Sequence, residues 1–245
     1  MRSELRILLG TLALAPIAAF GPRLVDQMST MQTFRISEVD VAGTRYLTRD
    51  SVVARLALGP FASVWGDRTA WVERLEDHPL VRDAEVHRRL PNGLRVEIEE
   101  RTPVALAAAP TLEPVDVEGM RLPIDPTRYP LDLPIISALR MPPPDAAVFP
   151  SEVRALASEM GHLETLDAEL ARRVSTIRRA SDGSIVLRLV APATELVLPS
   201  RVALDRLREG QAALSHAISL DPGRVPSVVD LRFAGQVVVR RDGRE

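Results

Sequence analysis

The sequence contains no cysteine and no lysine, and it is poor in aromatic residues. Without a single Cys among its 245 residues, the chain has no thiol nucleophile, disulfide or thiolate metal ligand. All 31 basic residues are Arg, so Lys-dependent phosphate loops and Schiff-base chemistry are absent as well. Five Phe, two Trp and two Tyr residues are too few for the aromatic girdles of a large outer-membrane barrel. The composition therefore excludes thiol- and lysine-based catalysis and disfavours a barrel.

Charge of either sign is nearly balanced. The 31 basic and 33 acidic residues leave a formal net charge of −2 and are interspersed along the chain. A nucleic-acid-binding surface needs a basic excess on one face, so no nucleic-acid partner is predicted. Hydrophobic residues make up 46% of the chain, which is enough for one large core or two modest ones. Two domains are the natural expectation.

An apolar run stands near the amino end of the chain. Residues 5–20 are almost entirely apolar, and Arg2 and Arg6 accompany the start of this run with only Glu4 to offset them. Positive charge before an apolar segment places the amino end in the cytoplasm. A bilayer core of roughly 30 Å needs about 20 residues, so the run is short for a membrane span. Pro16 also interrupts it.

Two interpretations of this segment stay open on the residues alone. In the first, residues 7–25 form a retained single membrane span after a cytoplasmic tail of residues 1–6, with Arg23 reaching the interface. In the second, the segment is a cleaved signal peptide, for which Ala18 and Ala19 offer the small residues of a cleavage site. Both interpretations place the rest of the chain on the extracytoplasmic side of the membrane.

The part that follows predicts a small domain with the order strand, helix, helix, strand, strand. The first strand ends at Gly43, one helix follows Thr48, and Asp67 caps a second helix. The turn Pro91-Asn92-Gly93 joins the last two strands, because Pro sets φ, Asn tolerates left-handed geometry and Gly supplies positive φ. Such a unit buries one face of its sheet against two helices.

The strand after this turn also carries a family resemblance. Its apolar and charged residues alternate as Leu94-Arg-Val-Glu-Ile98, and it continues into Glu100-Arg-Thr-Pro-Val-Ala105. This stretch resembles the POTRA domain of the bacterial cell-division family FtsQ, called DivIB in some lineages. Val39–Gly43 resembles that domain's first strand and turn, although Leu80 and Leu90 stand where the family often has Trp. The resemblance implies a POTRA domain over residues 34–105.

Residues 110–245 predict a second domain of different composition. Prolines recur from Pro110 to the run Pro142-Pro143-Pro144, which favours short strands such as 114–117 and 133–136 over helices. A helix begins at Ser151, and Ser181-Asp182-Gly183 marks a hairpin between two strands. Later segments predict a strand at 195–198, a helix with an apolar stripe from Leu204 to Ile218, and strands at 227–233 and 236–241. We expect a mostly antiparallel sheet with flanking helices on one face. With the first domain, this makes an α+β fold.

No catalytic, cofactor or metal site is predicted, and no small-molecule substrate. The four His residues are scattered without ligand spacing, and no Gly-x-Ser-x-Gly motif is present. Glu97 and Glu99 fall on the solvated face of their strand rather than in an acid–base cluster. Glu100-Arg101 is interpreted as a structural pair. A secreted hydrolase is therefore the weakest functional alternative.

The carboxyl-terminal segment is the strongest candidate for a binding site. Residues 236–240 form a β-branched run near the chain end, where an added strand is often an edge that can recruit a partner by β-augmentation. The alternatives are an ordinary core strand with Arg240 and Arg241 as charged gatekeepers, and a Phe233 that fills the core. Val229–Phe233 resembles the Asp-x-Arg-aromatic strand of FtsQ proteins, and the resemblance implies partner binding here. The candidate partner-binding residues are Arg232, Phe233, Gln236, Val237, Val238, Val239 and Arg240.

The family resemblance also implies a function. It indicates a non-enzymatic, single-pass membrane scaffold of the division machinery, with a retained anchor in the inner membrane at the septum. The partners it implies are the division proteins FtsB and FtsL, and the process is septal peptidoglycan assembly. The alternative is another POTRA-containing component of export or outer-membrane assembly.

Overall fold

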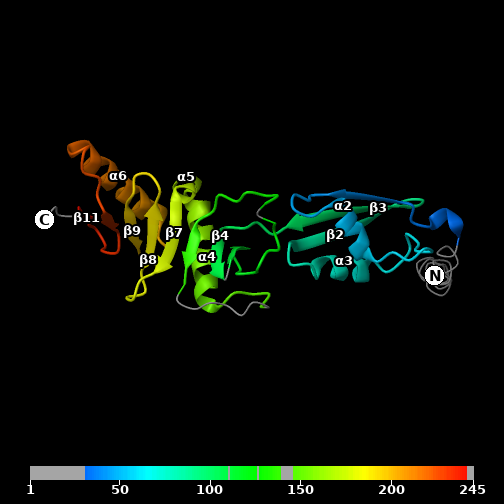
Figure 1. Ribbon diagram of the computed structural model, residues 1–245. Helices are drawn as coiled ribbons and strands as arrows, with labels where there is room; N and C mark the ends of the chain where they lie inside the picture. Colours follow the sequence, from blue (N-terminus) through cyan, green and yellow to red (C-terminus); the bar gives the residue numbers. More distant parts are fainter. Residues whose placement is uncertain (1–30, 110, 126, 139–145, 242–245) are drawn as a thin grey trace, which may run out of the picture. The chain divides into compact units, whose positions relative to one another are not determined.

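The computed structural model describes residues 31–241 except 110, 126 and 139–145. The chain divides into two compact units, one ending at Glu100 and the other beginning at Arg101 (Figure 1). This division comes a few residues before the end predicted for the first domain, because Val104 and Ala105 pack in the core of the second unit. The predicted tail and anchor, residues 1–25, lie outside the described residues. Within the part that is described, no helix is long and apolar enough to cross a membrane.

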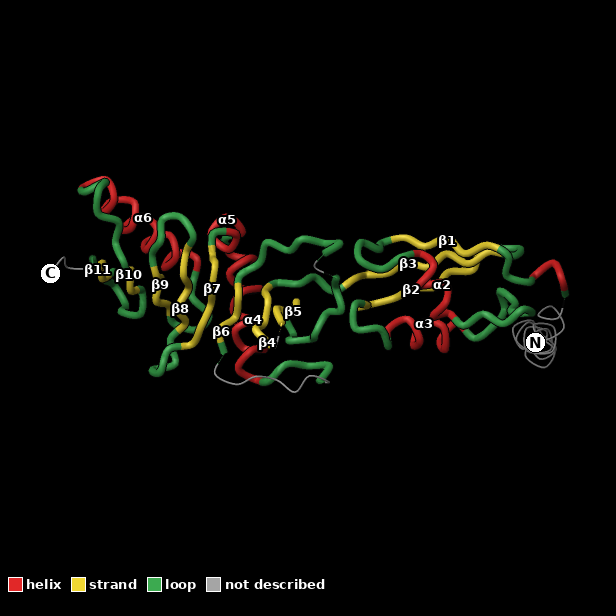
Figure 2. The backbone as a smooth tube through the Cα atoms, viewed as in Figure 1, coloured by secondary structure: helices red, strands yellow, loops and turns green. Residues whose placement is uncertain are grey.

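The first unit has the predicted order of elements. Strands β1 (Glu38–Ala42), β2 (Val81–Arg89) and β3 (Gly93–Glu100) form a sheet in the order β1-β3-β2, preceded by a short 3-10 helix η1 (Gln32–Phe34). Helices α2 (Arg49–Leu56) and α3 (Arg68–Glu76) lie between β1 and β2 in the chain (Figure 2). β1 runs parallel to β3, and β2 runs antiparallel to it. The predicted strand-helix-helix-strand-strand unit is therefore confirmed.

Local chemistry explains where these elements begin and turn. The Thr48 hydroxyl accepts from the Ser51 N–H at 3.2 Å, and the Asp67 carboxylate accepts from the N–H groups of Thr69 and Ala70, so both helices are capped at their first turn. Gly43 turns the chain after β1 with φ +84°, and a Cβ there would lie 2.1 Å from the Ile98 carbonyl oxygen. Only glycine fits that turn.

The second unit is built on one eight-stranded sheet in the order β11-β10-β9-β8-β7-β6-β4-β5. Its strands are β4 (Ala105–Ala109), β5 (Thr111–Val115), β6 (Ile135–Ser137), β7 (Val174–Arg179), β8 (Ile185–Leu189), β9 (Glu195–Leu198), β10 (Val228–Asp230) and β11 (Val238–Arg240). Its helices are α4 (Ser151–Leu166), α5 (Ala168–Arg172) and α6 (Leu204–Leu220), and all three contribute to a single core with the sheet.

This sheet is mixed, so the expectation of a mostly antiparallel sheet holds only narrowly. β10 pairs with β9, β6 with β7, and β4 with β6 in parallel, whereas the other four neighbouring pairs are antiparallel. Helices account for two of the three parallel pairs. α4 and α5 connect β6 to β7, and α6 connects β9 to β10, and a helical crossover returns the chain parallel to its starting strand.

Several predicted boundaries also move. The strands expected at 114–117 and 133–136 occur at Thr111–Val115 and Ile135–Ser137, and helix α5 was not predicted. The last two strands are shorter than the predicted 227–233 and 236–241, because residues 231–237 form the loop that joins β10 to β11. Four of the predicted partner-binding residues therefore lie in this loop rather than in a strand: Arg232, Phe233, Gln236 and Val237.

Candidate partner-binding edge

Strand β11 is the outermost strand at one end of the eight-stranded sheet. It pairs only with β10 among the described strands, with Val228 opposite Arg240, Val229 opposite Val239 and Asp230 opposite Val238. Its other side therefore carries backbone groups that no described strand of this chain pairs with. An edge of this kind is a template for an added strand.

The direction of the backbone groups shows which residues of β11 face outward. The carbonyl oxygen of Arg240 accepts from the Ser227 N–H at 3.0 Å, so it points toward β10. Backbone groups of successive residues in a strand point to opposite sides. The N–H and C=O of Val239 consequently point away from β10, and those of Val238 point toward it. Val239 presents the open hydrogen-bonding pair.

Side chains of β11 divide between the two faces of the sheet. Val239, together with Val237 just before the strand, is partly buried and packs against the core of the second unit. Arg240 is exposed, and its guanidinium lies 3.6 Å from the Asp230 carboxylate on β10. The strand is therefore held by its apolar face, while its outer edge remains open. An ordinary core strand with Arg240 and Arg241 as charged gatekeepers is compatible with the same placement, so partner binding decides between the two interpretations.

A buried carboxylate organises the loop that leads into β11. Asp230 is buried, and the Arg232 guanidinium grips it twice, with Nε to Oδ1 at 2.9 Å and Nη2 to Oδ2 at 2.6 Å. The Arg232 N–H also donates to Asp230 Oδ1 at 3.1 Å. These hydrogen bonds hold the pKa of the Asp230 carboxyl below its ordinary value. The Asp-x-Arg motif is thus a structural clamp at the end of β10.

The same arginine joins the loop to the hairpin between β7 and β8. Arg232 Nη1 forms an ion pair with Asp182 in that hairpin, in addition to its contact with Asp230. Asp182 accepts from the Ser184 hydroxyl at 2.6 Å, which is the main cause that lowers the pKa of the Asp182 carboxyl. All three guanidinium nitrogens of Arg232 therefore bind groups of this chain.

Arg206, on helix α6, is a functional candidate that the sequence did not single out. Its guanidinium donates to the backbone carbonyls of Leu231 at 3.0 Å, of Phe233 at 2.6 Å, and of Gln236. One side chain thus holds the loop between β10 and β11 at three points. In the sequence, Arg206 lies beside the apolar stripe of its helix, where an arginine is normally solvent-exposed. No local sequence pattern therefore predicts its contacts with the loop.

Phe233 lies on the surface of this loop. Its side chain is 45% exposed, and the Arg232 guanidinium stands 5.4 Å from the ring centroid. The alternative that Phe233 fills the core is therefore wrong. An exposed aromatic ring held against an arginine is a common anchor in protein–protein interfaces.

The carboxylates that were weighed as an acid–base cluster are either exposed to solvent or bound to neighbouring backbone groups. Glu97 and Glu99 are exposed on β3. The Glu100 carboxylate accepts from the N–H groups of Tyr46 and Leu47, both at 2.8 Å, whereas Arg101 pairs with Asp116 at 2.8 Å. Glu100 and Arg101 are thus both structural, but each binds within its own unit rather than to the other. The described residues contain no group of three or more His, Asp or Glu able to hold a metal.

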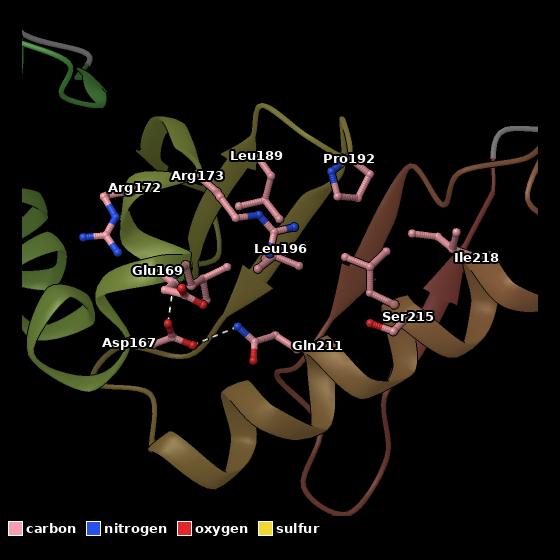
Figure 3. A pocket seen from close by; sticks show the side chains of 12 residues that line it. Asp167, Glu169, Arg172, Arg173, Leu189, Pro192, Leu196, Gln211, Ser215 and Ile218 are labelled. Carbon is pink, nitrogen blue, oxygen red and sulfur yellow. Dashed lines mark hydrogen bonds between the residues drawn. The ribbon is translucent and has the colours of Figure 1, made fainter.

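An open hollow of about 550 Å³ lies between α5 and α6 (Figure 3). Leu189, Leu196 and Leu214 contribute apolar surface to it, and charged side chains such as Arg172 stand at its rim. Asp167 accepts from the Leu170 N–H at 2.9 Å and from the Gln211 amide at 2.9 Å, and it caps α5 in this way. The Asp167 carboxylate therefore has a structural role at the start of α5.

Comparison with known proteins agrees with this architecture. Residues 34–101 match the family model described as POTRA domain, FtsQ-type. A cell division protein FtsQ of Rhodothermus marinus is 31% identical over 222 residues, covering 86% of this chain and 80% of the relative. FtsQ of Salinibacter ruber is 26% identical, covering 84% and 82%, and FtsQ of Myxococcus fulvus is 31% identical, covering 55% and 48%.

Fold and matches together define the class as a POTRA-domain protein with a second, β-rich unit. Within that class, the match to the Rhodothermus marinus protein extends over both units and well beyond the POTRA region. The chain belongs to the FtsQ family of cell-division proteins.

Proposed function

We propose that this chain is a non-enzymatic, single-pass membrane scaffold of the bacterial division machinery. Residues 7–25 anchor it in the inner membrane after a cytoplasmic tail of residues 1–6, and the POTRA domain of residues 34–105 and the β domain of residues 110–245 lie outside the cytoplasm. It recruits membrane division proteins of the FtsB and FtsL type for septal peptidoglycan assembly. Its relatives are named cell division proteins, which supports the process.

The open edge of β11 is the observation that carries the recruiting role. A partner strand added beside β11 would satisfy the outward N–H and C=O of Val239, and main-chain hydrogen bonds would supply affinity. Phe233, Gln236 and Arg240 are exposed beside this edge and would contact the partner's side chains. Arg232 positions the loop through Asp230 and Asp182, so its contribution to binding is indirect.

The recruiting edge is tested with a proline at Val239. Val239→Pro removes the outward N–H while sparing the pairing with β10, so the unit should fold and the partner should bind on the order of 10- to 100-fold more weakly. Val239→Ala is the matched control, because it keeps the N–H and should retain the partner. Co-purification of the full chain with its FtsB- and FtsL-type partners, alongside thermal melts, measures both effects.

A second proline separates binding from folding. The N–H of Val238 points toward β10, so Val238→Pro should lower the melting temperature as well as partner recovery. If Val239→Pro stays folded and keeps the partner at the wild-type level, β11 is not the binding edge. Cells depleted of the protein should grow as undivided filaments, and the Val239→Pro chain should fail to restore division.

Membrane topology is tested independently. A reporter fused after Glu245 should be active only outside the cytoplasm, because Arg2 and Arg6 precede the apolar run. The mature chain should keep its original amino terminus. An amino terminus near Phe20 would show signal-peptide cleavage and disprove the anchor, although export would survive.

A further inference from the structure

The first unit gathers its exposed large hydrophobic side chains at one end. Among its described residues these side chains are Met31 at 49% exposure, Phe61 at 70% and Leu90 at 57%. They come from three separate segments: the residue before η1, the loop between α2 and α3, and the turn between β2 and β3. We call these three residues the apolar tip. Scattered single hydrophobic residues need no explanation, but a gathered set marks an interaction site.

Backbone hydrogen bonds tie the three segments together. The Ile36 N–H donates to the Ala62 carbonyl at 2.9 Å, and the Val64 N–H donates to the Phe34 carbonyl at 2.9 Å. The Ser37 N–H donates to the Asn92 carbonyl at 2.9 Å. The start of the described chain, the α2–α3 loop and the hairpin turn therefore meet at the same end of the sheet (Figure 2).

Arginine side chains stand beside this apolar surface. The Arg35 guanidinium lies 4.8 Å from the centroid of the Phe61 ring, and the Arg88 guanidinium lies 5.6 Å from that of Trp65. Arg89 is exposed immediately before Leu90. Exposed apolar and aromatic side chains with arginines beside them are typical of surfaces that lie at a bilayer interface, where the rings enter the boundary and the guanidinium groups meet lipid phosphates.

Chain length brings this end of the unit to the membrane. Met31 belongs to the apolar tip, and only six residue steps separate it from Val25 at the end of the proposed anchor. Six steps reach roughly 20 Å when fully extended. An anchored chain therefore holds the apolar tip near the bilayer surface, at a high effective concentration.

We propose that the apolar tip docks on the extracytoplasmic face of the bilayer. Phe61 and Leu90 enter the boundary between headgroups and acyl chains, and Arg35 and Arg89 contact lipid phosphates. This proposal rests on the anchor of the proposed function and adds a second membrane contact to it. The docked tip would fix how the POTRA unit stands on the membrane.

The absence of Cys makes the test direct, because a single introduced Cys carries a nitroxide label. A Cβ at Gly59 would meet no atom within 4 Å, so a label at Gly59→Cys fits next to the apolar tip and leaves Phe61 intact. Asp83→Cys, exposed near the opposite end of β2, is the matched control. The full chain is placed in nanodiscs of phosphatidylcholine and phosphatidylglycerol, and label accessibility to oxygen and to a water-soluble nickel chelate is measured.

Docking predicts that the Gly59 label contacts oxygen and is shielded from nickel, whereas the Asp83 label is open to nickel. Phe61→Ser combined with Leu90→Ser should shift the ratio of docked to free tip about tenfold toward free, because burial of two apolar side chains is lost. The thermal melt should not change, since both side chains are exposed.

Three results would overturn the proposal. A Gly59 label as open to nickel as the Asp83 label, in a chain that stays with the nanodisc, would disprove lipid docking and leave the anchor standing. Shielding that arises only after division proteins are added would assign the tip to a protein partner instead. Loss of the chain from the nanodisc would disprove the anchor itself, and the docking with it.

Discussion

The two edges of the eight-stranded sheet are treated in opposite ways by the chain. At one edge, β5 contains Pro114, which has no N–H, and the Pro114 carbonyl accepts from the Leu122 N–H at 2.9 Å. Arg121 bridges to Val115 and pairs with Glu113 at 2.8 Å, so the segment after β5 folds back over its outer side. At the other edge, β10 is the one described strand with which β11 pairs.

The difference between these edges bears on function. Exposed edges invite unwanted pairing, and proteins usually close them with proline, charge or a covering segment. Here the chain closes β5 with all three devices and leaves Val239 of β11 open. The loop that leads into β11 is also held in place, by Arg206, Arg232 and Asp230. An edge strand that is left unpaired and is also held rigidly is what a docking site for a partner strand requires.

Breaking the contact between Arg232 and Asp230 beside β11 should cause the largest loss of stability. Arg232→Ala leaves the buried Asp230 carboxylate with Arg240 as its remaining cationic partner, beside the backbone N–H of residue 232, and should lower the free energy of unfolding. Partner recovery should fall too, because the loop loses its hold. Denaturant melts of wild type, Arg232→Ala and Arg232→Lys measure the loss. An unchanged melt for Arg232→Ala would show that the clamp contributes nothing to folding.

The exposed side chains at the two edges offer a matched pair. Phe233 near β11 is 45% exposed and Leu112 on β5 is 47% exposed. Phe233→Ala should weaken partner binding by about 1–2 kcal/mol, as expected for an aromatic anchor, and Leu112→Ala should leave binding unchanged. Neither variant should shift the melt by much. Equal binding losses for both variants would remove the distinction between the edges.

Acid should loosen the β11 clamp. Arg232 lowers the pKa of Asp230 below its unfolded value, so the carboxylate contributes stability above that unfolded value. This contribution is lost as pH falls through the folded pKa, and stability should therefore drop below about pH 4. The drop should be smaller in Asp230→Asn, which cannot titrate. Identical acid profiles for wild type and Asp230→Asn would contradict this account.

The smallest effects are expected away from both edges. Glu97, Glu99 and His87 are exposed in the POTRA sheet, and their single replacement by Ala should change stability by less than about 0.5 kcal/mol and leave division intact. Complementation of a depleted strain checks this. Loss of division by a folded, normally abundant variant would reopen the question of catalysis.

Local pattern predicted the regular parts of the molecule well. Strict alternation on β3, the Asp67 cap and the Asp182-Gly183 turn are short-range signals, and each occurs where it was expected. Parallel pairing in the second unit was underestimated, because it depends on how the α4 and α6 crossovers return, which no local window records.

The candidate site shows the same limit of sequence analysis. The apolar run at 236–240 indicated an outer strand, and the structure places β11 at the edge. The role of Arg232 could not be predicted, because Asp182 lies 50 residues away in sequence. Arg206 was missed for a similar reason, since its acceptors are backbone carbonyls 25 to 30 residues distant.

Amide exchange at β11 tests the central claim most directly. In the free chain, the Val239 N–H points outward and should exchange quickly, while the Val238 N–H, which faces β10, should be protected. In the complex with an FtsB-type partner, Val239 should become protected as its N–H joins the partner strand, and Val238 should change little. Exchange at Val239 that stays fast in the saturated complex would contradict the account.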